Sequence, residues 1–430
     1  MPLSLPASPF PGAPILVGYS GGLDSTVLLH QLAQDVDARA GGLRAIHVHH
    51  ALHPDADAWA AHCACICHLM DLPLLVVHVT VATGSGLGLE GAARDARHRA
   101  FNDALGEGEI LALAHHRDDQ AETFLLRALR GSGVDGLAAM RLWRVYGHGW
   151  LWRPLLDHPR EALRAFAIEH AMRWIEDPAN ADAGFDRTFM RTRLLPLLRE
   201  RWPNADVGLA RSAGLSAQAT ELLDAEDVVQ LARVQRSARS LDADALRTMS
   251  TARRARVLRR WIAGLGLPPL PGQGVAHIET DLLSARLDAE ARFDWAGARV
   301  QRWRNRLYAA PLREALPNDF ACEWDGRAPL QLPTGDLLEL AGAEAFDTCV
   351  RVHTRHGGER IALPRRSHRH ALKQVLLQHG VPPWERARMP LLSAADGELL
   401  AAGDAIVSAR LDAWLGERGA RLHWRREAMA

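Results

Sequence analysis

The sequence predicts an α/β protein whose first half forms a parallel sheet with helices on both faces. Short apolar runs rich in β-branched residues alternate there with segments whose apolar residues recur at helical spacing. Strands that alternate with helices are typical of parallel sheets with right-handed crossovers. The second half lacks this alternation, so we expect a mainly helical middle domain and then a small α+β C-terminal domain. The expected domains are residues 1–215, 216–318 and 319–430.

Length and composition limit the number of domains and the class of protein. The chain has 430 residues, of which 48% are hydrophobic and 24% charged, as is ordinary for a globular protein of several domains. The formal net charge is +0, so a polyanionic partner must be met by a local basic patch. No basic residue precedes the first apolar positions, and no apolar run reaches the length of a membrane span. We therefore expect a cytoplasmic protein.

The first domain is expected to be Rossmann-like, with ligands bound beyond the carboxyl ends of its strands. The expected strands are residues 15–17, 45–48, 74–79, 110–114 and 150–156. Helices are expected from the first loop to residue 34 and over residues 57–70, 89–105 and 118–129. A further helix is expected after Asp157, with this residue as its acidic cap. Polar clusters follow three of the strands, and we expect these clusters to meet.

The first cluster is a loop that leads from a strand into a helix, and it consists of Ser20, Gly21, Gly22, Leu23, Asp24 and Ser25. Backbone N–H groups and the positive end of a helix dipole at such a position form a phosphate site. The loop lacks the Lys-Ser/Thr pair of a Walker A motif and the third glycine of the dinucleotide fingerprint. It resembles the PP-loop of ATP pyrophosphatases, with Asp24 placed to hold a divalent cation. A polar turn with a serine cap is the alternative.

The second cluster, His47, His49 and His50, ends a strand, where histidines are also ordinary surface residues. The third spans residues 115–123 and begins with His115. In it Asp119 and Glu122 are three residues apart on one helix face, a spacing that suits an ammonium ligand. Acidic residues in a first helical turn also stabilise the helix itself, so both interpretations remain open.

Other charged or sulfur-containing residues have two interpretations each. Arg94 and Arg97 are spaced to bind a polyphosphate or to form surface salt bridges. Cys63, Cys65 and Cys67 are compatible with a metal site, but buried core positions are the commoner use of such residues. The arginines of residues 187–201 and 351–369 form either solvated faces or contacts to nucleic-acid phosphates. The latter group has Glu359 as its single opposing charge, and the last domain is expected to contain one helix, beginning near residue 370.

Six motifs occur in the order seen in the tRNA(Ile)-lysidine synthetase family of the PP-loop, or N-type ATP pyrophosphatase, superfamily. They are SGGLDS, HVHHAL, ARDARHRAF, LAHHRDDQAETFLLRALRGSGVDGL, WIEDPAN and FDRTFMRTRLLPLL. The later segment HGGERIALPRRSHRHALKQVLLQHGVPPWERARMPLL resembles that family's C-terminal domain. The resemblance therefore spans nearly the whole chain.

The resemblance implies a ligase that adenylates the wobble cytidine of tRNA(Ile) with a CAU anticodon and then joins free L-lysine to C2, releasing AMP. The implied co-substrate is ATP with Mg²⁺, bound by the loop of residues 20–25, with Asp24 at the metal. Arg94, and less directly Arg97, would face the α-phosphate, and His115 would line the reacting centre. Asp119 and Glu122 would receive the lysine amine. A homodimer is one assembly that we consider.

Two positions depart from the family pattern. His49 stands where many members have Asn, in a motif whose Arg is also missing here, and Thr188 stands where an Asn usually follows the Arg of a DRN motif. Two other functions remain open. A PP-loop tRNA thiolase would need paired cysteines, and the chain has no CxxC motif. A tRNA-binding protein with a decayed active site is the second.

Overall fold

A computed structural model describes residues 3–82, 88–177, 186–286, 291–366 and 368–426. Residues 178–180 of the WIEDPAN motif lie outside this set. The chain divides into two compact units, Met1–Glu226 and Asp227–Ala430, and each is described by itself. No helix in the described ranges is long and apolar enough to cross a membrane.

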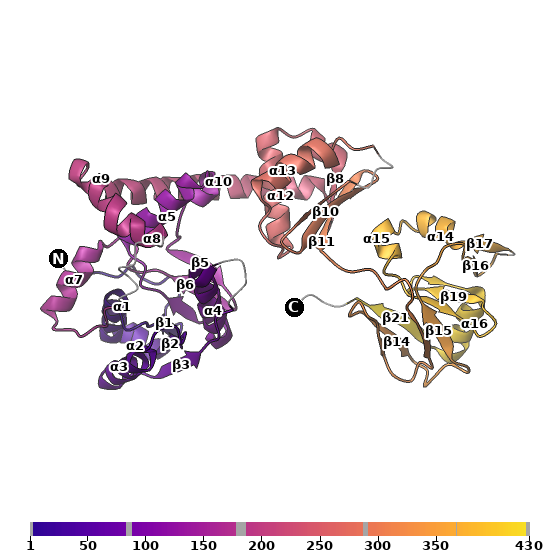
Figure 1. Cartoon of the computed structure of the whole chain (residues 1–430), viewed down its shortest axis with the longest axis horizontal. Helices are drawn as coiled ribbons and strands as arrows, with labels where there is room; N and C mark the ends of the chain where they lie inside the picture. Colours follow the sequence, from indigo (N-terminus) through magenta and orange to yellow (C-terminus); the bar gives the residue numbers. More distant parts are fainter. Residues whose placement is uncertain (1–2, 83–87, 178–185, 287–290, 367, 427–430) are drawn as a thin grey trace. The chain divides into compact units, whose positions relative to one another are not determined.

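The first unit is built on a six-stranded sheet with the order β3-β2-β1-β4-β6-β5 (Figure 1). Its strands are β1 (Ile15–Gly18), β2 (Leu43–His49), β3 (Leu74–His78), β4 (Ile110–Ala112), β5 (Trp143–Tyr146) and β6 (Gly149–Trp152). The strands β1, β2, β3, β4 and β6 pair in parallel, as the sequence predicts. The edge strand β5 pairs antiparallel with β6 and was not predicted.

The prediction of a strand over residues 150–156 is wrong at its C-terminal end. The strand β6 stops at Trp152, and the chain then turns, with the Leu156 N–H donating to the Arg153 carbonyl at 3.2 Å. Pro154 has no backbone N–H and cannot continue a central ladder. The turn leaves Arg153 at the carboxyl end of the sheet.

Eleven helical segments of this unit fall within the described residues. They are α1 (Leu23–Gln34), α2 (Val36–Gly42), α3 (Ala56–Leu69), α4 (Gly88–Ala104), α5 (Arg117–Leu129), α6 (Val134–Leu137), α7 (Arg160–Glu169), α8 (Asp186–Phe189), the π-helix η2 (Met190–Leu194), α9 (Leu195–Arg201) and α10 (Ala205–Val234). The predicted helices around residues 23–34, 57–70, 89–105 and 118–129 are confirmed.

Helices cover both faces of the sheet because successive strand residues point to opposite sides. Ile15 and Val17 pack in one hydrophobic cluster with side chains of α1, α3 and α7. Leu16, between them in sequence, packs in a second cluster with Phe101 and Leu105 of α4 or the turn after it. The parallel sheet is therefore buried on both faces, as its continuous apolar strands require.

The helix after Asp157 begins differently from the prediction. The N-cap of α7 is Pro159, and no side chain of the cap residue bonds to the helix. The Arg160 N–H instead donates to Asp118 Oδ2 at 2.9 Å, so a carboxylate of α5 satisfies the start of α7. A contact between residues this far apart in sequence cannot be read from local capping patterns.

The second unit contains three sheets. The first has the order β7-β8-β11-β10-β9, with strands β7 (Gln235–Ser237), β8 (Ser240–Asp242), β9 (Arg292–Trp295), β10 (Ala298–Trp303) and β11 (Arg306–Pro311). It packs with α11 (Ala243–Arg247), α12 (Thr251–Gly264), α13 (Gly272–His277) and the π-helix η3 (Ile278–Leu282). The alternation of apolar and polar residues over 298–308 predicts one strand there. That prediction is wrong, because the chain reverses at Arg304, where φ is +54°, and forms a hairpin.

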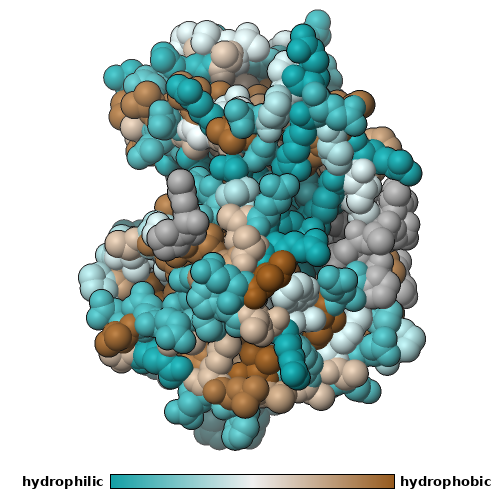
Figure 2. Space-filling model, turned by 90° about the vertical axis from the view of Figure 1, so that its left-hand side faces the viewer, coloured by the Kyte–Doolittle hydropathy of each residue, from teal (hydrophilic) through white to brown (hydrophobic). Residues whose placement is uncertain are grey.

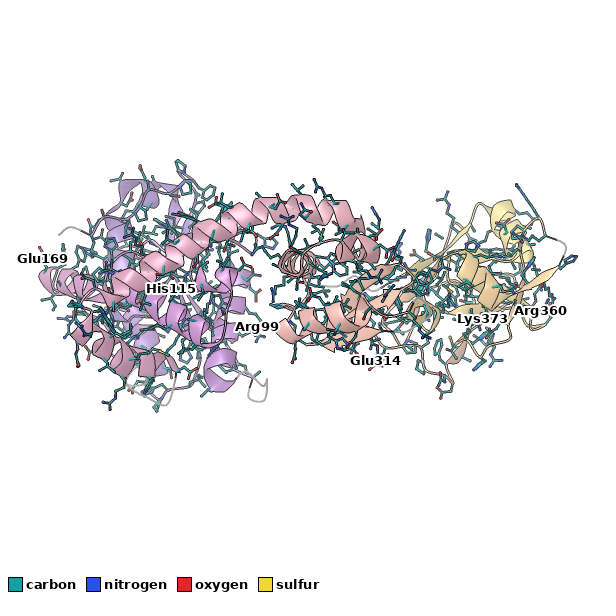
Figure 3. The ribbon with its side chains drawn as sticks, turned by 90° about the horizontal axis from the view of Figure 1, so that it is seen from above. Arg99, His115, Glu169, Glu314, Arg360 and Lys373 are labelled. Atoms are coloured by element: carbon teal, nitrogen blue, oxygen red, sulfur yellow. The ribbon has the colours of Figure 1, made fainter. Side chains whose placement is uncertain are left out.

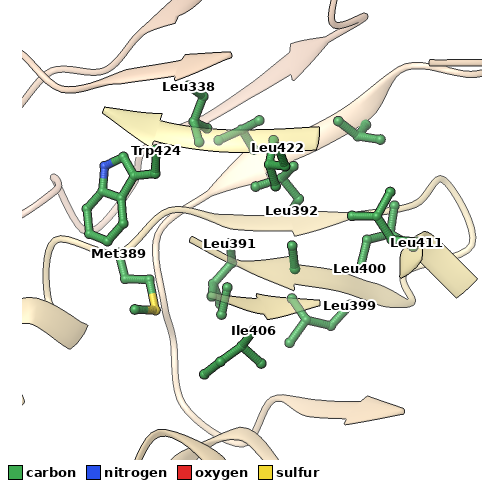
Figure 4. Close-up of a cluster of buried hydrophobic side chains, with 14 of the residues drawn as sticks. Leu338, Met389, Leu391, Leu392, Leu399, Leu400, Ile406, Leu411, Leu422 and Trp424 are labelled. Atoms are coloured by element: carbon green, nitrogen blue, oxygen red, sulfur yellow. The ribbon is translucent and has the colours of Figure 1, made fainter. Parts of the chain in front are cut away.

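The last part of the chain contains a seven-stranded and a three-stranded sheet. Their strands are β12 (Ala321–Trp324), β13 (Leu330–Gln331), β14 (Leu337–Ala341), β15 (Val350–His353), β16 (Arg360–Ala362), β17 (Arg369–Ala371), β18 (Leu391–Ser393), β19 (Leu399–Ala402), β20 (Ile406–Val407) and β21 (Arg421–Arg425). The prediction of one helix is wrong, since the described residues of this part form three: α14 (Leu372–Gln378), α15 (Pro383–Arg386) and α16 (Ala409–Arg418). Figure 4 shows the apolar core, in which Met389 and Trp424 lie among leucines.

The close pairing of β4 and β6 gives a test of the fold. A Cβ atom added at Gly149 would lie 2.1 Å from the backbone oxygen of Glu109. We expect Gly149→Ala to lower the free energy of unfolding by about 2 kcal/mol, because the two strands must separate to admit the methyl group. Urea denaturation monitored by circular dichroism measures this change. Gly208→Ala in α10 is the control, since nothing lies within 4 Å of that position, and equal stability of the two variants would contradict the expectation.

Candidate active site

The carboxyl ends of β2, β1, β4 and β6 lie side by side along one edge of the sheet. The loop of residues 20–25 follows β1, and His115 and His116 follow β4. The neighbours of β1 are β2 on one side and β4 on the other, which makes this edge the switch point where open α/β sheets bind ligands. Two of the predicted polar clusters are therefore adjacent, with the histidines of β2 beside them.

The loop after β1 requires glycine at Gly21. Its φ is +80°, and a Cβ atom there would lie 2.6 Å from Ile175 Cδ1 and 2.9 Å from Cys63 Sγ. Gly22 is the N-cap of α1 without a side-chain hydrogen bond, so the serine cap considered as an alternative is absent. Ser25 Oγ instead donates to the Gly22 carbonyl at 3.0 Å. The start of the twelve-residue helix α1 thus carries no side-chain cap of its own.

Asp24 lies in the first turn of α1 with an ionised carboxylate. Burial alone would raise the pKa of Asp24, but the hydrogen bond and charge of His116, together with nearby arginines, outweigh burial and lower it. Asp24 Oδ2 lies 3.6 Å from His116 Nε2, and Oδ1 lies 3.8 Å from Arg160 Nε. Oδ1 is inaccessible to water and has no hydrogen-bond partner. An ionised oxygen with an unused lone pair fits Mg²⁺, which combines one or two carboxylates with substrate phosphates.

Asp119 and Glu122 share a face of α5, as their spacing predicts, and both are buried. The guanidinium of Arg191, in η2, contacts them both. Its Nε donates to Glu122 Oε1 at 2.7 Å, and one terminal nitrogen donates to Asp119 Oδ1 at 3.0 Å and to Glu122 Oε2 at 3.2 Å. Burial raises the pKa of Glu122, and Arg191 partly opposes that shift. The carboxylate pair therefore already binds one cationic group, supplied by the chain.

His116 connects the loop of residues 20–25 to the pair of Asp119 and Glu122. This role was not predicted from the sequence. It is the N-cap of α5, where its Nδ1 accepts from the Asp119 N–H at 3.4 Å and its own N–H donates to Asp119 Oδ2 at 3.1 Å. Its Nε2 lies between Asp24 and Asp119, at 3.6 and 3.4 Å from their carboxylates. Burial alone would lower the pKa of His116, but these carboxylates raise it. The available signal in the sequence was a histidine just before a predicted helix.

His115 lies in the first unit (Figure 3) and is uncharged at neutral pH. Burial lowers its pKa to about 3; Asp119 opposes this shift, while Arg153, Arg187 and Arg94 add to it. Its Nδ1 is inaccessible and has no hydrogen-bond partner. A neutral imidazole offers one donor and one acceptor, so His115 can position a substrate but does not supply an imidazolium.

Arg94 and Arg97, both on α4, are exposed and lie near other groups of this edge. Burial lowers the pKa of His98 to about 4, and the positive charges of Arg94 and Arg97 contribute to the shift. Arg97 also contributes to the lowered pKa of His50, which burial dominates. Both arginines thus add positive charge beside β2 and β4, in agreement with a polyanion site.

The residues that depart from the family pattern have structural partners. His49 is buried, its Nε2 lies 3.0 Å from Asp57 Oδ1, and its ring packs on that of His78. Thr188, in α8, accepts at its carbonyl a hydrogen bond from the Thr192 hydroxyl at 2.8 Å. The side chain of His49 makes its contacts, whereas the Thr188 bond is to the backbone and does not depend on the side chain at that position.

Two of the three cysteines of α3 belong to the core. Cys63 and Cys67 are buried in the same hydrophobic cluster as α1, whereas Cys65 is exposed. Cys63 Sγ lies 3.4 Å from His47 Nδ1, which also lies 3.0 Å from the Tyr19 carbonyl. Among the residues described, no group of three metal-binding side chains is found. The packing favours the core interpretation for Cys63 and Cys67.

Two arginines of residues 187–201 contact carboxylates of the site, with 30% and 33% of their side chains exposed. Arg191 binds the carboxylate pair, and Arg199 donates to Asp118 Oδ1 at 2.5 Å. Asp206 of α10 accepts from Arg117 at 2.8 Å and lies 3.7 Å from Arg199. These ion pairs join α5 to α9 and α10, and they give Arg191 and Arg199 carboxylate partners within the chain. That the segment contacts tRNA phosphates stays a prediction.

Comparison with known proteins agrees with these features. Three family models match: the PP-loop domain over residues 4–198, the TilS substrate binding domain over residues 241–308 and the TilS substrate C-terminal domain over residues 350–424. The chain is 53% identical to the tRNA(Ile)-lysidine synthase of Xanthomonas axonopodis pv. citri, covering 99% of this chain and 97% of that protein. The chain belongs to the tRNA(Ile)-lysidine synthase family.

Other relatives have the same name and nearly the same extent. The tRNA(Ile)-lysidine synthase of Xylella fastidiosa (strain Temecula1) is 50% identical over 97% of each chain. That of Serratia proteamaculans is 41% identical over 96% of each chain. The match to the PP-loop domain covers the six-stranded sheet and the loop of residues 20–25. This loop contains the candidate ATP-binding residues.

The position of His116 between carboxylates predicts a pH-dependent stability. Because its pKa is raised in the folded state, its contribution is complete below the unfolded pKa and is lost as the pH rises through the folded pKa. We expect His116→Asn, which keeps a good N-cap residue, to lose about 1 kcal/mol or more of unfolding free energy at pH 6 and less at pH 9. Urea titrations at both pH values measure this. An equal loss of unfolding free energy at pH 6 and pH 9 would show that the ion pairs of His116 do not stabilise the fold.

Proposed function

We propose that this protein ligates free L-lysine to C2 of the wobble cytidine of tRNA(Ile) with a CAU anticodon, forming lysidine through an adenylated tRNA and releasing AMP and pyrophosphate. The observation that carries the proposal is the arrangement around His116. This residue links Asp24, in the phosphate-binding loop, to Asp119, in the carboxylate pair. A site for metal-bound ATP and a site for an ammonium group are thus adjacent. Family membership supports the same reaction.

ATP binds at the start of α1 in this proposal. The loop residues Ser20, Gly21, Gly22, Leu23, Asp24 and Ser25 surround its phosphates, with backbone N–H groups and the helix dipole as anion ligands. Asp24 holds Mg²⁺, which neutralises phosphate charge when it is bound. Arg94 faces the α-phosphate, where a guanidinium stabilises the negative charge that builds during adenylation. His115, which is neutral, positions the reacting groups by hydrogen bonding.

Lysine binds through its ε-ammonium to Asp119 and Glu122, in the place that Arg191 holds. A buried carboxylate without a cation is costly, so Arg191 keeps the pair neutralised until lysine replaces it. Glu122, whose pKa burial raises, accepts the proton that leaves the ammonium group. The free amine then attacks C2, and the bond between C2 and the AMP oxygen breaks.

The rest of the chain binds the tRNA. We assign residues 1–215 to catalysis, residues 216–318 to a tRNA-contacting middle domain and residues 319–430 to a C-terminal tRNA-binding domain. Figure 3 labels Arg360 and Lys373 in this last part. The prediction that Glu359 alone opposes its arginines is wrong, since Glu398 also lies 3.6 Å from Arg369.

A reaction that uses tRNA and ATP also supports a cytoplasmic location. The partners in this proposal are tRNA, ATP and free L-lysine, and no membrane. A homodimer is our proposal for the assembly. It is supported by a stripe of exposed side chains on α10 at intervals of seven residues, Leu215, Leu222 and Val229, which are 56%, 77% and 48% exposed. Figure 2 shows the first unit from the side, where hydrophilic side chains are interspersed with smaller hydrophobic patches.

Transfer of labelled lysine tests the proposed function. Purified protein with ATP and Mg²⁺ should incorporate lysine into a transcript of tRNA(Ile) with a CAU anticodon, and into no methionine tRNA with the same anticodon. We expect Asp24→Ala to reduce incorporation at least about 100-fold, because metal-bound phosphates lose a charged ligand. Release of AMP without incorporation would remove lysine as the nucleophile. Silence in both assays would favour the tRNA-binding alternative.

The carboxylate pair gives a separate prediction. Glu122→Gln keeps the shape of the side chain and removes its charge, so we expect the KM for lysine to rise about tenfold or more while the KM for ATP changes little. Steady-state assays with each substrate varied in turn measure the two constants. Asp37→Asn, on the exposed start of α2, is the control. Equal effects on lysine and ATP would contradict the assignment of Glu122 to the lysine amine.

A further inference from the structure

Arg153 lies at the same edge of the sheet as the site but has no part in the proposed function so far. It directly follows β6, whose neighbour in the sheet is β4. His115 comes three residues after the end of β4, and the charge of Arg153 is close enough to contribute to the lowered pKa of His115. Since adjacent strands lie about 4.8 Å apart, the end of β6 is about 10 Å from the phosphate-binding loop after β1.

The guanidinium of Arg153 is buried without a counter-charge. The residue is 6% exposed, yet its side chain forms no ion pair with a carboxylate of the described residues. One terminal nitrogen donates to the Arg141 carbonyl at 2.7 Å. The Nε atom is inaccessible and has no hydrogen-bond partner. Buried arginines normally form ion pairs with carboxylates. A buried arginine without such a partner, at the edge of the sheet where ligands bind, therefore suits an anionic ligand.

The surroundings of Arg153 are also positive. The pKa of Arg153 is lowered to about 10, mainly by burial and also by the charges of Arg144, Arg94 and Arg127. The residue therefore stays charged at neutral pH, in an environment that repels it. Like charges collected in this way destabilise the folded chain, and a polyanionic ligand removes that cost when it binds.

We propose that Arg153 binds a backbone phosphate of the tRNA beside the reacting cytidine. This inference rests on the proposed function, because it takes tRNA as the polyanion. The exposed residues Arg94, Arg97 and Arg144 continue the positive charge from Arg153 to the surface. Such a track suits a nucleic-acid strand that passes from solvent into the site. The phosphates of ATP are bound two strands away, at the loop after β1.

The hydrogen bond to the Arg141 carbonyl offers a structural role as the competing explanation. A structural role predicts lower stability in any variant that loses this bond, with unchanged electrostatics of tRNA binding. A phosphate contact predicts that the salt dependence of tRNA affinity follows the charge at position 153. The two are separated by comparing Arg153→Met, which removes the charge, with Arg153→Lys, which keeps it.

The experiment measures binding of the CAU-anticodon tRNA(Ile) transcript to the full chain by filter binding at several salt concentrations. We expect Arg153→Met to weaken binding about tenfold and to make the slope of log K against log salt concentration less steep by about 0.7, the value for one single-strand phosphate. Arg153→Lys should keep the parent slope. Arg164→Met, an exposed position on α7, removes the same charge and should also keep it.

The remaining outcomes overturn the inference. If both Arg153 variants keep the salt dependence of the parent protein and have a lower Tm, the residue has a structural role. A weaker affinity for ATP or inorganic pyrophosphate in Arg153→Met, with the parent slope for tRNA, would assign Arg153 to the nucleotide. If Arg164→Met changes the salt dependence as much as Arg153→Met does, the effect comes from the net charge of the protein and not from a contact of Arg153. Parent protein that binds no tRNA would instead contradict the proposed function itself.

Discussion

The site depends on one buried interaction, the position of the His116 imidazole between the carboxylates of Asp24 and Asp119. Asp24 belongs to the helix after β1 and Asp119 to the helix after β4, so the histidine joins two neighbouring crossovers of the sheet. A half-buried and a buried carboxylate this close repel each other unless a cation or donor lies between them. His116 supplies that donor and caps α5 with its other nitrogen, which fixes the distance between the phosphate-binding loop and the carboxylate pair.

Charges of both signs surround His115. The carboxylate of Asp119 raises its pKa, and the guanidiniums of Arg153, Arg187 and Arg94 lower it. Carboxylates suit a metal ion and an ammonium group, whereas guanidiniums suit phosphates. A reaction that joins an amine to a phosphate-activated base needs both kinds of group around its substrates. The neutral imidazole of His115 adds no charge of its own.

Much of the first domain could be predicted because its strands are short apolar runs and its helices have regular apolar spacing. The loop of residues 20–25 and the shared face of Asp119 and Glu122 were predicted for the same reason, since both depend on local sequence. The edge strand β5 was missed because only its pairing with β6 defines it. The hairpin at Arg304 was missed because a non-glycine residue adopts positive φ there, without the usual turn signal.

The contacts that sequence reasoning could not supply are those between distant segments. Arg191 is 69 residues from Glu122, and in the sequence it belongs to an ordinary basic amphipathic stretch. Its place on the carboxylate pair follows from the packing of η2 against α5. The hydrogen bond of Asp57 to His49 and the missing partner of Arg153 likewise emerge only when separate elements come together.

Arg191 occupies the carboxylate pair of Asp119 and Glu122, which we propose as the lysine site. A crystal structure of the protein with L-lysine bound tests this assignment. We expect lysine Nζ within hydrogen-bond distance of both carboxylates and the Arg191 guanidinium displaced from Glu122. Lysine bound elsewhere, with the Arg191–Glu122 bonds intact, would contradict it.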